Sequence, residues 1–203
     1  MTRGDRFHSA PRGPIPGSYW VEPARLLAGE YPSELDEAEA EEKRALLAQA
    51  GVDFFLDLTE AGELPPYEGR IAPLEHRRMH IRDFGCPSRG EMRAILDTID
   101  DALARGRRVY VHCWGGIGRT GTVIGCWLVR HGRRPHDSLA LIAERRRDMP
   151  GGRRRSPETD EQRLFVEGWE EDARAEELSD GTLEPDEADP LLDPWDEGAD
   201  DET

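Results

Sequence analysis

The predicted architecture rests on one stretch, Val111-His112-Cys113-Trp114-Gly115-Gly116-Ile117-Gly118-Arg119-Thr120-Gly121. It joins an apolar run typical of a buried strand, residues 107–112, to a helical pattern over residues 118–131. A cysteine placed directly after such a strand faces the first turn of the next helix. There the free backbone N–H groups and the helix dipole favour the thiolate over the thiol. The stretch therefore predicts an activated nucleophile at a strand–helix junction.

The residues that follow Cys113 favour binding of an anion. Four glycines let the chain wrap tightly and turn its N–H groups inward as a nest. Arg119 adds a planar fork of donors that fits two oxygens of a phosphate. A nucleophile held against a tetrahedral dianion suits phosphoryl transfer through a phosphocysteine. The predicted phosphate-binding residues are Trp114, Gly115, Gly116, Ile117, Gly118 and Arg119.

Strand and helix patterns alternate on both sides of this stretch. Strands are expected over residues 19–21, 25–29, 52–58, 76–82 and 107–112. Helices are expected over residues 36–50, 88–105, 118–131 and 137–147, with a last one opened by Ser156-Pro157. This order predicts an α/β fold with a central, mostly parallel sheet of four to five strands and helices on both faces.

The charge of the chain is concentrated at its C-terminal end. The 203 residues include 27 basic and 43 acidic side chains and carry a net charge of −16. Residues 167–203 hold 17 of the acidic side chains and one basic one, so they account for the whole imbalance. We therefore expect a flexible lead-in over residues 1–17, a folded domain over 18–172 and an acidic tail of disordered composition over 173–203.

Composition also narrows the class of protein. No apolar run is long enough to span a membrane, and the N-terminus lacks an apolar signal core. The negative total disfavours nucleic acid as a partner. The three cysteines, Cys86, Cys113 and Cys126, lack CxxC spacing, which argues against a disulfide framework and favours a cytoplasmic protein. No membrane partner is expected, and the oligomeric state stays open.

Other motif interpretations fit less well. Residues 116–121 also spell GxGxxG, and Asp137 lies 21 residues beyond Gly116, but a helix rather than a second strand lies between them. A Walker loop would need a lysine after the glycines. His76 and His80 are four residues apart without the glutamate of a metalloprotease, so no metal site and no cofactor are expected.

The stretch resembles the signature of the cysteine-dependent protein tyrosine phosphatase superfamily: His-Cys, five residues, Arg, then Ser or Thr. His112, Cys113, Arg119 and Thr120 match it in full. The resemblance implies that Cys113 attacks phosphorus, that Arg119 clamps the equatorial oxygens and that Thr120 assists departure of the thiolate. It implies a tyrosine-phosphatase-like fold.

Hydrolysis also needs a proton donor for the leaving oxygen. The run Arg82-Asp83-Phe84-Gly85-Cys86-Pro87 resembles the P-D-x-G-x-P general-acid loop of the dual-specificity branch, which implies that Asp83 is the acid. Asp57, near another strand end, is the second candidate. Cys86 could form a protective disulfide with Cys113 under oxidation.

A third loop resembles the Q-T-x-x-Q-x-x-F motif of tyrosine phosphatases. Thr159 and Gln162 match it, and Glu158 replaces the first glutamine. The resemblance implies a water-positioning role for Gln162 or Glu158, although a plain N-terminal helix turn accounts for the pattern equally well.

The resemblance implies a protein phosphatase acting on phosphotyrosine, with or without phosphoserine and phosphothreonine. The absence of basic residues at 114–118 disfavours inositol lipids. Alternatives are a phosphatase of RNA 5′ ends or small phosphorylated metabolites, or a non-catalytic phosphate-binding module. The acidic tail either solvates the protein or folds back on residues 145–155. Candidates for recognition of a phosphorylated protein substrate are Tyr67, Arg153, Arg154 and Arg155.

Overall fold

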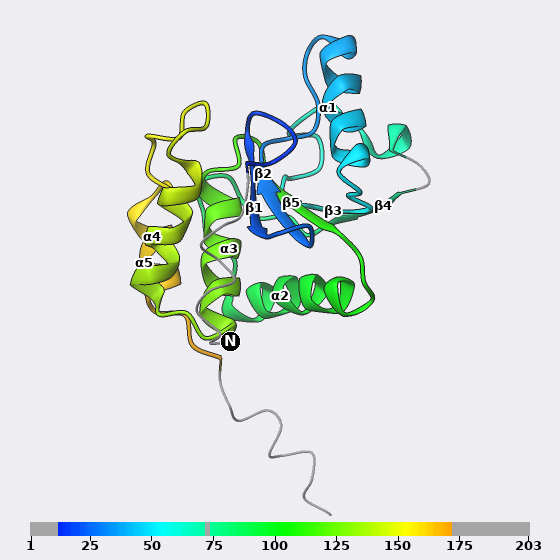
Figure 1. The fold of residues 1–203 in the computed structure, drawn as a ribbon. Helices are drawn as coiled ribbons and strands as arrows, with labels where there is room; N and C mark the ends of the chain where they lie inside the picture. The colour runs from blue at the N-terminus through cyan, green and yellow to red at the C-terminus, as the bar shows by residue number, and fades with distance from the viewer. Residues whose placement is uncertain (1–11, 72–73, 172–203) are drawn as a thin grey trace, which may run out of the picture. The chain divides into compact units, whose positions relative to one another are not determined.

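The computed structural model describes residues 12–71 and 74–171. In this part of the chain, five strands form one sheet in the order β1-β2-β5-β3-β4 (Figure 1). β1 is antiparallel to β2, and every other pairing is parallel. The predicted α/β class and mostly parallel sheet are confirmed. The strands are β1 (Ser18–Glu22), β2 (Leu26–Gly29), β3 (Phe54–Asp57), β4 (Glu75–Arg78) and β5 (Val109–His112).

Helices cover both faces of the sheet, as predicted (Figure 1). One face packs against α2, α3 and the two C-terminal helices, and the other packs against α1 and the chain around Tyr67. Burial of these apolar side chains is the main force that holds the layers together. The helices are α1 (Glu37–Gln49), α2 (Arg89–Ala104), α3 (Gly118–Arg130), α4 (Pro135–Arg146) and α5 (Asp160–Glu167), with a short 3₁₀ turn, η2 (Glu68–Arg70).

The largest differences between predicted and observed element ends are in β4 and in the last helix. The expected strand over residues 76–82 is β4, which ends at Arg78. The last helix does not open at Ser156, because the Ser156 hydroxyl donates to the carbonyl of Ile117. It begins at Asp160, where Thr159 and Gln162 form a capping box. The capping box predicted at Ser88 is present.

The ends of the chain are described only in part. Of the expected lead-in, the structure describes residues from Arg12 onward, where Ile15 is buried in the core. The acidic tail over residues 173–203 lies outside the described residues, as does its expected contact with residues 145–155. No helix in the described ranges has the length and apolar character needed to cross a bilayer.

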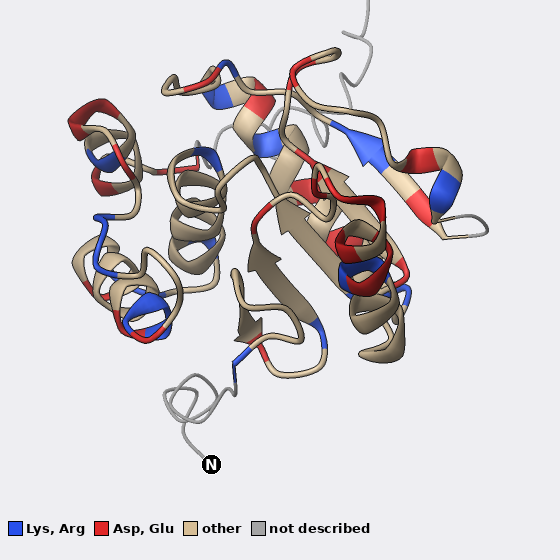
Figure 2. Cartoon of the chain, turned by 90° about the horizontal axis from the view of Figure 1, so that it is seen from above, with Lys and Arg blue, Asp and Glu red and all other residues tan. Residues whose placement is uncertain are grey.

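Strand register brings polar residues to one end of the sheet. His112 of β5 is paired with Gly29 of β2 and Asp57 of β3, and Asp57 is paired with Arg78 of β4. The strands are tan through most of their length in Figure 2, and the charged edge strand is β4. Since crevices at the carboxyl ends of parallel strands are where α/β proteins bind ligands, this end is the place to look for a site.

Candidate active site

The loop after β5 has the shape that its glycines predict. Cys113 follows the strand with 3% of its surface exposed, and α3 begins at Gly118. Gly116 has a φ of +63°, and a Cβ there would lie 2.3 Å from the carbonyl carbon of Gly29. Only glycine therefore allows both the backbone conformation and the close approach to the end of β2.

Donors outside the loop hold its carbonyl groups. Tyr31 N–H donates to Trp114 O (2.7 Å), and the buried Arg146 donates through Nη1 to Gly116 O (2.6 Å). Within the described residues, the backbone N–H groups of residues 114–118 have no hydrogen-bond acceptor. They are thus the donors left for an anion, as the sequence predicts.

Arg119 is buried and lies between two carboxylates. Its Nη1 and Nη2 donate to Glu63 Oε2 and Oε1 at 2.7 and 2.6 Å, and Nη2 lies 3.0 Å from Asp83 Oδ1. Burial alone would lower the pKa of Arg119, but the hydrogen bond with Glu63 and the nearby Cys113 raise it above its usual value. In turn, the hydrogen bond from Arg119 holds the pKa of Glu63 below its usual value. The guanidinium is therefore a fixed cation.

The donors of Arg119 show where a phosphate fits. A guanidinium has five N–H groups. Glu63 takes one from each Nη, and the second N–H of Nη1 faces the carbonyls of Leu58 and Ile81 at 3.4 and 3.3 Å. Nε–H and the second N–H of Nη2 remain as a fork for two oxygens. Asp83 lies against this fork, so the structure brings the predicted acid to the predicted phosphate site.

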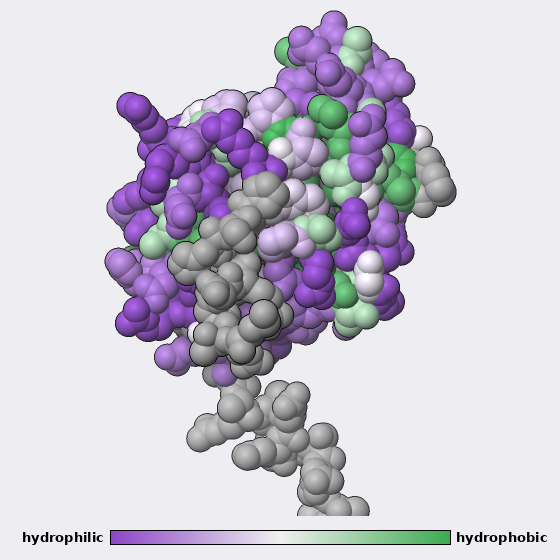
Figure 3. Space-filling view, viewed as in Figure 1, coloured by the Kyte–Doolittle hydropathy of each residue, from purple (hydrophilic) through white to green (hydrophobic). Residues whose placement is uncertain are grey.

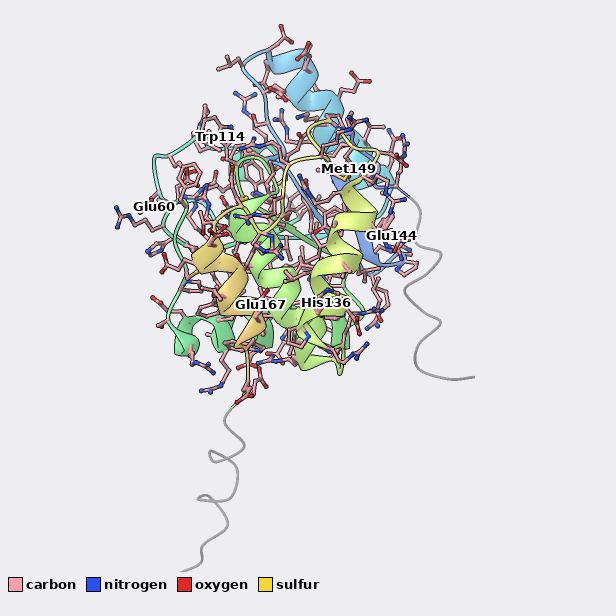
Figure 4. All side chains as sticks on the ribbon, turned by 90° about the vertical axis from the view of Figure 1, so that its left-hand side faces the viewer. Glu60, Trp114, His136, Glu144, Met149 and Glu167 are labelled. Atoms are coloured by element: carbon pink, nitrogen blue, oxygen red, sulfur yellow. The ribbon has the colours of Figure 1, made fainter. Side chains whose placement is uncertain are left out.

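Glu63 is a site residue that sequence reasoning missed. It lies in the loop between β3 and η2, which carries few pattern signals. Two hydrogen bonds hold this loop in place. Glu60 N–H donates to Glu63 Oε2 (3.0 Å), and Tyr31 OH donates to Pro65 O (2.8 Å). Glu60 and Trp114 lie above His136 and Glu167 in Figure 4. Glu63 comes a few residues after the end of β3. Because the end of β3 lies next to the end of β5, this loop lies close to the loop of Cys113.

The interpretation of Tyr67 as a substrate-stacking residue is wrong. Its side chain is fully buried, and its hydroxyl forms a 2.6 Å hydrogen bond with His112 Nε2. Burial raises the pKa of Tyr67, so the hydroxyl stays protonated. Burial also lowers the pKa of His112 to about 4, so the imidazole is neutral near pH 7. Tyr67 is therefore held in the core by His112, the residue before Cys113, and has no exposed surface for stacking on a substrate.

The interpretation of Asp57 as the second candidate for the general acid is also wrong. Its carboxylate is fully buried and accepts hydrogen bonds from the Thr59 amide and hydroxyl and from Arg78. Burial alone would raise its pKa, but the bonds from His76 and Thr59 and the nearby His112 hold the pKa well below the usual value. A carboxylate with no exposed surface and no proton near neutral pH cannot protonate a leaving group.

The water-positioning role of Gln162 does not fit its surroundings. Gln162 is fully buried, and its Oε1 accepts from the N–H groups of Glu158 (3.1 Å) and Thr159 (3.2 Å). The side chain of Glu158 pairs with Arg154. The recognition candidates Arg153, Arg154 and Arg155 are all exposed, and Arg155 pairs with Asp160 at 2.6 Å.

Thr120 and Cys86 are the remaining residues with a role expected from the sequence. Thr120 is buried, and within the described residues its Oγ1 has no hydrogen-bond partner, so it can serve a group on the nucleophile. Cys86 is partly buried, and burial together with Glu161 raises its pKa to about 11. Since thiol–disulfide exchange needs a thiolate, this shift disfavours the disulfide with Cys113.

The exposed apolar side chains of the described domain are few, and two of them lie next to residues of the site. The face drawn in Figure 3 is mostly hydrophilic, with small apolar areas. Two large apolar side chains near the site are exposed. Trp114 follows Cys113 in the chain, and Phe84 follows Asp83. In the described ranges no group of three or more His, Cys, Asp or Glu side chains could hold a metal ion.

Comparison with known proteins agrees with this geometry. Residues 32–133 match the family model Tc-R-P, described as "Polymorphic toxin system, DSP-PTPase phosphatase". The chain is 35% identical over 92 residues to 067L of Invertebrate iridescent virus 3, named as a candidate tyrosine phosphatase, covering 40% of this chain and 36% of that protein. It is 34% identical over 62 residues to the dual specificity protein phosphatase CDC14B of Mus musculus, covering 30% of this chain and 12% of that protein. The chain thus spans less than two thirds of these relatives.

A solved structure matches over more of the chain. The crystal structure of Tk-PTP in a mutant form superposes with a TM-score of 0.60 at 28% sequence identity. The match covers 74% of this chain and 92% of that one.

Proposed function

Because this chain belongs to the DSP-PTPase family of cysteine-dependent, dual-specificity-like phosphatases, we propose that it hydrolyses phosphotyrosine in proteins through a phosphocysteine intermediate. The family fixes the reaction class, a phosphatase of the protein-tyrosine-phosphatase type. The phosphorylated protein and the covalent intermediate are the proposal. One observation carries it: the guanidinium of Arg119, in the loop of Cys113, keeps one fork free, and Asp83 lies at that fork.

The first step uses Cys113 and Asp83. The thiolate of Cys113 attacks phosphorus, so a sulfur–phosphorus bond forms as the bond to the leaving oxygen breaks. Asp83 gives its proton to that oxygen, and the product leaves as a phenol. Arg119 and the N–H groups of residues 114–118 stabilise the charge on the three equatorial oxygens. Glu63 holds the guanidinium in place for this purpose.

The second step returns the enzyme to its starting state. Water attacks phosphorus, Asp83 takes the proton from that water, and the sulfur–phosphorus bond breaks. The buried hydroxyl of Thr120 is available to donate to the departing thiolate. Inorganic phosphate then leaves, the Cys113 thiolate is restored, and the proton that Asp83 took from water exchanges with solvent.

The surroundings of the loop favour an aromatic phosphate. No residue from 114 to 118 is basic, so nothing in the loop would neutralise additional phosphate groups. Exposed aromatic side chains, Trp114 and Phe84, lie one residue from the nucleophile and the acid. Aromatic rings pack well against each other, which suits a phenolic leaving group. A catalytic thiol also needs a reducing compartment, and we place the enzyme in the cytoplasm for that reason.

The test is hydrolysis of para-nitrophenyl phosphate by the purified full chain with EDTA present. Cys113→Ser should lose activity, whereas Cys126→Ser, which changes a buried cysteine on α3, should keep it. Mass spectrometry of acid-quenched enzyme should detect one phosphate on Cys113. Retained turnover in Cys113→Ser would overturn the mechanism.

A substrate panel tests the specificity. Phosphotyrosine peptides should give the highest kcat/KM when compared with phosphoserine peptides, nucleotides, RNA 5′ phosphates and inositol phosphates. A higher kcat/KM for any of the last three would replace phosphotyrosine by that class. A wild-type chain that binds phosphate without turnover would instead be a binding module.

A further inference from the structure

The amide group of Gln162 links the turn before α5 to the general-acid loop and lies close to the start of α3. Its Oε1 accepts from the N–H groups of Glu158 and Thr159, and its Nε2 donates to the carbonyl of Gly85 at 3.0 Å. A Cβ on Gly118 would lie 3.0 Å from Oε1 and 3.1 Å from Nε2. The amide therefore lies against the start of α3, between the general-acid loop and the turn before α5.

The Gly85 bond is important because the general-acid loop, residues 82–87, has few other attachments. Its backbone makes one local hydrogen bond, from Gly85 N–H to Arg82 O. Within the described residues, the bond from Gln162 is the one that ties this backbone to another element. Its remaining polar link is the ion pair of the Asp83 side chain with Arg119, at the fork where phosphate would bind. When phosphate takes that fork, Gln162 is the tether that remains.

We propose that Gln162 is a positioning residue that braces the general-acid loop against the phosphate-binding loop and so sets the place of Asp83 over the leaving oxygen. This rests on the proposed function, since it assigns the residue that positions its acid. Gln162 acts through Gly85 and touches neither substrate nor water. A buried amide with three hydrogen bonds to backbone groups is suited to this task, because each bond would cost free energy to break without solvent to replace it.

The brace predicts a defect that depends on the leaving group. Protonation matters when the leaving oxygen is basic, as in phenyl phosphate, and matters little when it is a stable anion, as in 2,4-dinitrophenyl phosphate. A misplaced Asp83 should therefore slow the first substrate and spare the second. A lost water-positioning group would slow the breakdown of the intermediate, which is common to all substrates.

Gln162→Glu is the sharpest variant. Glutamate at this helix position retains an acceptor for the capping box of α5, so the turn before α5 is preserved. It lacks the Nε2–H that donates to Gly85 O. The matched control is Arg163→Gln, which changes the next residue on α5 and leaves the brace intact.

We expect Gln162→Glu to reduce kcat/KM for phenyl phosphate by about 10- to 100-fold, part of the 10²- to 10⁴-fold that general acid catalysis supplies. The same variant should lose less than about 3-fold with 2,4-dinitrophenyl phosphate. In an Asp83→Asn background the change at residue 162 should add almost nothing, because both act through one acid. An equal loss of kcat with both substrates, with kcat/KM unchanged and a burst of phenol, would overturn the brace in favour of water positioning.

Hydrogen exchange tests the brace without any turnover. Peptides covering residues 82–87 should exchange faster in Gln162→Glu than in wild type or Arg163→Gln, whereas those covering 109–112 should not change. Unchanged exchange over residues 82–87 would overturn the proposal. An inactive wild-type chain would refute the proposed function, and the exchange result would still decide the brace.

Discussion

Replacing Asp83 by asparagine should tighten the binding of inorganic phosphate while slowing turnover. Asp83 Oδ1 lies 3.0 Å from Arg119 Nη2, at the fork that Glu63 leaves for phosphate. Phosphate must therefore displace a carboxylate or bind beside its charge. The Asp83 side chain is 40% exposed, so solvent weakens its ion pair with the buried Arg119, and we take the pair as worth about 1 kcal/mol.

This magnitude sets the expected change in affinity. Removal of about 0.5–1 kcal/mol of competition tightens phosphate binding by about 2- to 5-fold at low ionic strength. Loss of the acid lowers kcat for phenyl phosphate by about 10²- to 10⁴-fold. The increase in affinity should shrink as salt is added, because salt screens the exposed Asp83 side of the pair.

The assay is titration calorimetry with phosphate, supported by competitive inhibition measured with 2,4-dinitrophenyl phosphate. The matched control is Asp137→Asn, which removes a partly exposed aspartate that pairs with Arg134 at the start of α4. Its phosphate affinity should equal that of wild type. If Asp83→Asn binds phosphate no more tightly than wild type, Asp83 does not compete for the fork and the reasoning fails.

Three other changes test the framework beneath the loop. Asp57→Asn should reduce stability at pH 7 by about 3 kcal/mol, because buried donors lose a charged acceptor. Burial alone would raise the pKa of Asp57, but its hydrogen bonds hold it low, so its contribution is complete above about pH 4 and is lost in stronger acid. Melting curves of the two proteins should therefore converge as the pH falls. Arg146→Met removes the donor to Gly116 O and should cost about 1–3 kcal/mol in thermal melts and raise KM. Tyr67→Phe leaves His112 Nε2 unpaired and should cost about 1–2 kcal/mol in urea unfolding, whereas an unchanged midpoint would contradict the network.

The features that could be predicted from sequence are those encoded by neighbouring residues. The strand before Cys113, the glycines after it and the cap at Ser88 each act within a few positions of the chain. The same holds for the order of strands and helices, which implied a mostly parallel sheet. Ser156 shows the limit of such reasoning: its sequence is typical of a helix cap, yet its hydroxyl bonds to a loop 39 residues away.

The remainder of the site depends on which distant segments the sheet brings together. Glu63 reaches Arg119, and Gln162 reaches Gly85, across 56 and 77 residues. Tyr67 looked like a surface aromatic in a loop, but it is buried against His112. Local patterns fix backbone conformation because it depends on adjacent residues. The partners of a side chain depend on strand order and register, and these are set by the packing of the whole core.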